Sequence, residues 1–205
     1  MVRELKNCRQ IFIPILVILF GFLNLPLETF SQSATVPVNI TVNGTLTVSD
    51  ASNDSNSGKD PTINVNLSVT PDLGAAAATG NANFRIRTNR SVWRLTAQRT
   101  TEIDTGPTNI SASDINLLVT TQVGTNANSM AGTLAAPFNA QTDLSSISTA
   151  SPVNVINGTA KTSTVRDSTN ANNYFQVNTQ YSILPDFFFQ PGTWRTTITY
   201  SLVSP

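Results

Sequence analysis

The sequence contains almost none of the residues that most often carry out chemistry. It has no histidine, and its single cysteine, Cys8, lies within the first ten residues. A Ser-His-Asp relay needs an imidazole, and zinc sites and thiol nucleophiles are built from histidine and cysteine. We therefore expect a non-catalytic protein that carries no metal and no cofactor.

Charged side chains are also scarce, and neither sign dominates. The chain has 12 Lys and Arg residues against 12 Asp and Glu residues, with a formal net charge of +0. Proteins that bind nucleic acid or anionic lipid usually carry a basic excess, so neither partner is expected. Lysine and glutamate, common on exposed helix faces, occur after residue 34 only as Lys59, Lys161 and Glu102. Abundant threonine favours strands over helices.

Only one long hydrophobic run occurs, from Ile11 to Leu23, and it follows a segment with several basic residues. Its thirteen residues fall short of the roughly 20 that a membrane-spanning helix needs, and the small residues SQSA come later. We expect residues 1–34 to be a signal peptide, with an uncleaved N-terminal anchor as the alternative. Residues 35–205 are then one secreted domain, extracellular or at the surface of a bacterium, with no stable membrane span.

No disulfide can hold that domain together, because Cys8 belongs to the leader. Short segments of alternating apolar and polar residues recur between polar turns. This pattern predicts an all-β fold, a single antiparallel β-sandwich that is immunoglobulin-like or pilin-like. After the first segment, strands are expected at residues 63–69, 84–87, 92–97, 115–119, 153–155, 174–183 and 194–203.

Two hairpins are expected among these strands. Residues 84–87 and 92–97 are predicted to pair, with an inner face formed by Phe84, Ile86, Trp93 and Leu95. Asn157-Gly158 is predicted to be the turn of the second hairpin.

The first segment of the expected domain, VPVNITVNGTLTV, alternates strictly. A two-residue turn at Asn43-Gly44 would place Leu46 on the opposite face from Val42, whereas a continuous strand keeps one face apolar. We predict a continuous strand about 40 Å long, in which the glycine marks a bend, a bulge or a close approach of another group. The candidate assembly residues are Val36, Val38, Ile40, Val42, Gly44, Leu46 and Val48.

A strand of this kind suits assembly. Its apolar face and unpaired backbone groups can complete the sheet of a neighbour by β-augmentation. The same residues can instead be the first strand of their own sheet, and the sequence leaves these alternatives open. The expected partners are other copies of the chain or other surface proteins.

Arginines concentrate between residues 85 and 99. In the expected hairpin, Arg85, Arg87 and Arg94 face outward, where guanidinium groups could bind an anionic cell-wall polysaccharide. The alternative is a solvated sheet face that discourages edge pairing.

Two acidic patterns are weaker. The alternating oxygen-bearing residues of the loop around residues 54–60 resemble those of calcium loops, with a plain polar turn as the alternative. Glu102 and Asp104 lie two apart, as a catalytic pair could, with a solvated loop as the alternative.

Two stretches resemble known surface-protein families. Trp93-Arg94-Leu95 and Tyr200-Ser201-Leu202 resemble the paired Trp-x-Leu motifs of WxL domains, although Tyr200 stands where the motif has tryptophan. This resemblance implies binding to bacterial cell walls, and it marks Trp93, Leu95, Tyr200 and Leu202 as motif residues.

VNITVNGTLTV is similar to the N-terminal segment of major fimbrial subunits of the alternate chaperone-usher kind. That resemblance implies a donor strand that closes a neighbour's incomplete sandwich. We therefore expect a structural or adhesion module that assembles through residues 36–48, with wall binding as the alternative.

Overall fold

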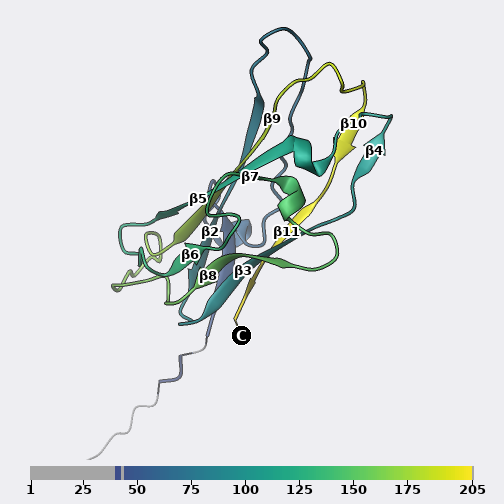
Figure 1. Ribbon diagram of the computed structural model, residues 1–205. Coiled ribbons are helices and arrows are strands. Elements are labelled where there is room, and N and C mark those ends of the chain that lie inside the picture. The colour runs from purple at the N-terminus through teal and green to yellow at the C-terminus, as the bar shows by residue number, and fades with distance from the viewer. Residues whose placement is uncertain (1–39, 43, 205) are drawn as a thin grey trace, which may run out of the picture. The chain divides into compact units, whose positions relative to one another are not determined.

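The computed structural model describes residues 40–42 and 44–204 (Figure 1). Contacts divide the chain between Thr41 and Val42. The fold is therefore that of the part after this division. Its strands are β1 (Leu46–Asp50), β2 (Ala78–Thr88), β3 (Trp93–Arg99), β4 (Ile103–Thr105), β5 (Ile115–Val123), β6 (Gly132–Leu134), β7 (Thr142–Asp143), β8 (Val153–Gly158), β9 (Phe175–Ile183), β10 (Thr193–Arg195) and β11 (Ile198–Val203).

These strands form two main antiparallel sheets. Sheet A has the order β1-β2-β9-β5-β7, and sheet B has the order β11-β3-β8-β6. β10 and β4 pair separately. Single turns of 3-10 helix occur at Asn56–Gly58, Ala112–Asp114 and Leu144–Ser146. No described residue belongs to a helix with the length and hydropathy of a membrane span.

The core lies between the two sheets. Trp93 of β3 meets Phe175 of β9 edge to face, with ring centroids 5.8 Å apart. Phe84 of β2 packs on Tyr200 of β11 at 5.1 Å between centroids. Because each pair joins one sheet to the other, the sheets pack face to face. The prediction of an all-β antiparallel sandwich is confirmed.

β9 illustrates why these residues form strands. Its odd-numbered residues, from Phe175 to Ile183, are buried and its even-numbered residues are not. A period of two places every second side chain on the same face of a strand. β9 lies between β2 and β5, where its inner face covers the core.

The hairpin predicted at residues 84–97 is wrong. β2 belongs to sheet A, where it pairs with β1 and β9, and β3 belongs to sheet B, where it pairs with β8 and β11. The chain crosses from one sheet to the other between them. The predicted inner face is nevertheless confirmed, because Phe84, Ile86, Trp93 and Leu95 are all buried.

The hairpin predicted at Asn157-Gly158 is also wrong. Both residues end β8, which pairs with β3 and β6. A side chain at Gly158 would overlap the indole ring of Trp93, and one at Gly132 would lie 2.9 Å from the same ring. Gly158 is therefore required by the close approach of a tryptophan and not by a turn.

Candidate assembly surface

The first described residues of the chain are exposed to solvent. Ile40 is 82% exposed and Val42 is 78% exposed, and neither belongs to a strand. The predicted continuous strand is therefore corrected, because the described strand begins only at Leu46. The physical reason is that Leu46 pairs with Thr88, the last residue of β2, so residues before it lie beyond the end of that partner.

Of the predicted assembly residues, Val36 and Val38 lie outside the described residues. Leu46 and Val48 belong to β1 and thus to their own sheet. Val48 is half-buried against the core, while Leu46 is 38% exposed.

Gly44 and Thr45 attach the incoming chain to the end of β2. The Thr45 N–H donates to Asn89 Oδ1 at 2.8 Å, and the Thr88 hydroxyl donates to the Thr45 carbonyl at 2.7 Å. The guanidinium of Arg90 occupies the space that a side chain at Gly44 would need. The glycine thus marks a close approach, one of the three roles expected for it.

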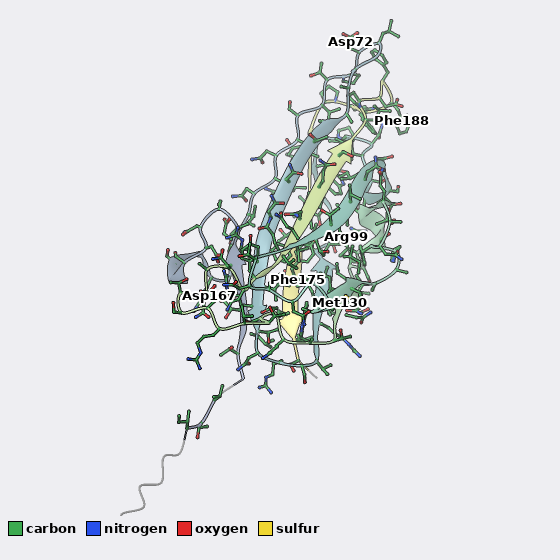
Figure 2. All side chains as sticks on the ribbon, turned by 90° about the vertical axis from the view of Figure 1, so that its left-hand side faces the viewer. Asp72, Arg99, Met130, Asp167, Phe175 and Phe188 are labelled. Atoms are coloured by element: carbon green, nitrogen blue, oxygen red, sulfur yellow. The ribbon has the colours of Figure 1, made fainter. Side chains whose placement is uncertain are left out.

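We call the end of the sandwich that contains Thr88 the base. The opposite end, where Ala78 of β2 pairs with Ile183 of β9, is the tip. The chain enters at the base. Figure 2 shows Asp72 and Phe188 together at the tip, far from Asp167.

Residues 61–71, here called the seam segment, alternate without belonging to a strand. Their odd-numbered residues are half-buried and their even-numbered residues are exposed. Among the backbone hydrogen bonds of the described residues, none involves the seam segment. The predicted strand at 63–69 is thus correct in its side-chain pattern and wrong in its backbone pairing. The side chains that pack against the core are Ile63, Val65, Leu67 and Val69.

The seam segment runs from the middle of β2 toward the tip. Ile63 borders a surface hollow with Ala51 and Asn83. Further along, Val65 and Leu67 lie where a side chain of Gly80 would point, with their methyl groups 2.6 and 3.0 Å from that position. Inward side chains of β2 alternate with exposed ones, and Gly80 is in the inward set. The seam segment therefore covers the inner side of the first half of β2.

The same half of β2 lacks a strand on one edge. β1 pairs only with residues 84–88, and β9 takes the other edge along residues 78–86. The Asn83 carbonyl accepts from the Ala51 N–H at 3.2 Å, which shows that Asn83 directs its backbone groups to the β1 side. Alternate residues of a strand face the same edge, so Thr79 and Asn81 do so as well. No described strand pairs with them there.

Met130 is 71% exposed and lies away from the tip in Figure 2, but four other strongly exposed apolar residues lie at the tip. They lie in the two loops that leave the paired ends of β2 and β9, and they are Leu73 (92% exposed), Leu184 (62%), Phe187 (72%) and Phe188 (69%). Of the three consecutive phenylalanines, only Phe189 packs against the core.

Arg85 and Arg87, predicted to bind an anionic polymer, are engaged by the protein itself. Both guanidinium groups bind the carboxylate of Asp54, Arg85 at 2.8 Å and Arg87 at 2.6 Å. Arg85 also stacks on the Tyr174 ring at 3.9 Å from its centroid and donates to Gln176 at 3.0 Å. These contacts join the loop after β1 to the outer face of sheet A.

The Asp54 carboxylate is strongly stabilised in its charged form. Burial alone raises its pKa, but hydrogen bonds from Arg87, Ser49 and Arg85 outweigh the burial and hold the pKa well below its ordinary value. The Ser49 hydroxyl donates at 2.7 Å. With its oxygens occupied by cationic partners, Asp54 functions as an internal anchor. No group of metal-ligating side chains occurs among the described residues.

Arg94 does not share a face with the other two arginines. It lies on β3 in sheet B, where it is exposed, whereas Arg85 and Arg87 lie on β2 in sheet A. The predicted three-arginine face is therefore corrected. The physical reason is the crossing of the chain between sheets after β2.

The four motif residues belong to neighbouring strands. Leu95 of β3 lies directly opposite Leu202 of β11. Trp93 is fully buried, and its indole N–H donates to the Ala160 carbonyl at 2.8 Å. Tyr200 donates to or accepts from the Tyr181 hydroxyl at 3.2 Å. The motif-like residues therefore serve as core packing in this structure.

The paired acidic residues are separately engaged. Glu102 binds Arg99 at 2.8 Å, and Asp104 accepts from the Thr108 hydroxyl at 2.7 Å. Both contacts are local, as in a structured loop.

The free edge of β2 was not predicted from the sequence. An available signal was Gly80, a glycine within the expected domain that interrupts an apolar series before Ala82 and Phe84. A glycine inside a strand often indicates that another chain segment comes close.

No protein-family model matches the sequence, and a search of curated proteins finds no matching relative.

Proposed function

We propose that the protein is a non-catalytic, extracellular surface subunit whose copies join through the segment before Leu46. The segment of one copy adds to an open edge of the next, as in β-augmentation. Other copies of the chain are the principal partner, and the setting is the surface of a bacterium.

The observation that carries this proposal is the exposure of Ile40 and Val42. Each is about four-fifths exposed, at 82% and 78%. Single exposed apolar residues are normal, but these two alternate with polar neighbours in a strand-like series that continues upstream. Burying both in a partner contributes about 3–6 kcal/mol before the cost of ordering the segment.

The positions of the exposed apolar groups support an end-to-end arrangement. The chain enters at the base through Thr45, and exposed residues such as Phe187 and Phe188 lie at the tip. A contact between base and tip uses two different surfaces, which produces rings or open chains of subunits instead of two-fold pairs.

The test compares two double variants that place the same charges on opposite faces of the segment. Ile40→Asp with Val42→Asp places charges on the apolar face, and Asn39→Asp with Thr41→Asp places the same charges on the polar face. We expect the first to remain monomeric and the second to assemble as the wild type does, measured by light scattering and by SDS-resistant ladders on gels. Equal behaviour of the two variants contradicts the proposal.

The wall-binding alternative stays a prediction. It relied on an outward arginine face and on the resemblance to the Trp-x-Leu motifs of WxL domains. Among the described residues, Arg85 and Arg87 bind Asp54, and Trp93 is inside the core.

A further inference from the structure

We propose that the seam segment, residues 61–71, occupies the site that receives residues 36–42 of a second copy, and that it leaves when the second copy binds. The inference rests on the proposed function and names its acceptor site. Joining is then an exchange of one strand-like segment for another.

The first argument is the match between the two segments. Residues 36–42 read VPVNITV and residues 63–69 read INVNLSV, so each has four β-branched or aliphatic side chains at alternate positions. The positions between them carry proline, asparagine and threonine in the first segment and asparagine and serine in the second. Residues 36–42 and 63–69 are equal in number, so the two stretches span the same length when both are extended. One segment can therefore replace the other side chain for side chain.

The second argument is that exchange breaks no backbone ladder. The seam segment makes no backbone hydrogen bond to any described residue, and its inward side chains are only half-buried. A strand that pairs with the free edge of β2 gains hydrogen bonds at Thr79 and Asn81, which the seam segment leaves unused. These new bonds offset the advantage that the seam segment has from being part of the same chain.

The third argument is direction. The seam segment runs toward the tip, since Ile63 lies beside Asn83 and Asp72 comes just before the turn into β2. An incoming segment with the same direction enters near the middle of the acceptor and leaves at its tip. In the donor, β1 begins at Leu46, shortly after the incoming segment, so the base of the donor lies close to the tip of the acceptor. The exchange thus brings the base of one copy to the apolar tip of the next.

A disulfide across the seam provides the test. An ideal Cβ on Gly80 lies 4.0 Å from the Cβ of Val65, within the spacing of about 3.5–4.5 Å that a disulfide spans. We propose the double variant Val65→Cys with Gly80→Cys, with Cys8 replaced by serine so that no other thiol is present. The matched control is Val65→Ser with Gly80→Ser, which changes the same positions and forms no bond.

We expect the oxidised cysteine variant to assemble at least tenfold more slowly than the same protein after reduction, while the serine control assembles alike under both conditions. Assembly of the oxidised form within twofold of the reduced form overturns the exchange, and the proposed function then survives with another acceptor. Failure of the thiols to join also overturns it, because the seam segment is then not docked on β2. Monomers in every sample, wild type included, overturn the proposed function itself.

Discussion

Replacing Asp54 by asparagine tests how the loop after β1 is held to sheet A. The carboxylate binds Arg85 and Arg87 and accepts the Ser49 hydroxyl, and its side chain is 16% exposed. Asparagine keeps the size of the side chain and removes its charge. Two guanidinium groups that are 22% and 18% exposed then lose their anionic partner.

The expected loss is about 2–3 kcal/mol of unfolding free energy at pH 7, since each hydrogen bond to a charged group contributes about 1.5–3 kcal/mol and the partly exposed arginines recover some hydration. Asp54 has a folded pKa below its unfolded one. Its stabilisation is therefore fully present above the unfolded pKa of about 3.9 and decreases as the pH falls from there through the depressed folded pKa.

Urea unfolding of the wild type and Asp54→Asn, followed by tryptophan fluorescence at a series of pH values, measures both effects. The gap between the two proteins should be widest at neutral pH and should narrow below about pH 4. A gap below 0.5 kcal/mol at pH 7, or one that widens on acidification, would refute the reasoning.

Three further predictions concern the core and the tip. Trp93→Phe loses the hydrogen bond to the Ala160 carbonyl and leaves space in the core, so it should cost about 2–4 kcal/mol in thermal unfolding. Gly158→Ala places a methyl group in the space that the Trp93 indole ring occupies. It should therefore lower the unfolding free energy by about 1–3 kcal/mol or more, which melting curves would show. Phe187→Ser with Phe188→Ser should change stability by less than about 0.5 kcal/mol, because both rings are exposed. The same variant should weaken assembly in light scattering, and unchanged assembly would argue against a role for the tip.

Side-chain alternation predicted the faces of strands reliably. The buried set of β9 and the inward residues Phe84, Ile86, Trp93 and Leu95 follow the parity read from the sequence. Alternation reports the environment of side chains, one face in the core and one in solvent. It carries no information about which strand supplies the backbone partner.

The errors all concern partners. β2 and β3 are neighbours in sequence, yet β2 pairs with β9, about ninety residues away, as the contact between Phe84 and Val177 shows. The seam segment has the pattern of a strand and no ladder. Asp54 meets Arg85 from a distant loop. Such choices depend on the packing of the whole sandwich, which a short stretch of sequence does not encode.

The most direct measurement of the central claim is a disulfide between two copies. The pattern match aligns Val38 of the donor with Val65 of the seam segment, which lies against Gly80. Mixing a Val38→Cys copy with a Gly80→Cys copy, both with Cys8→Ser, should yield a disulfide-linked pair in mass spectrometry, and Asn39→Cys, with the opposite parity, should yield far less. Assemblies that form without the Val38–Gly80 link, or that link equally well through Asn39, would contradict the account.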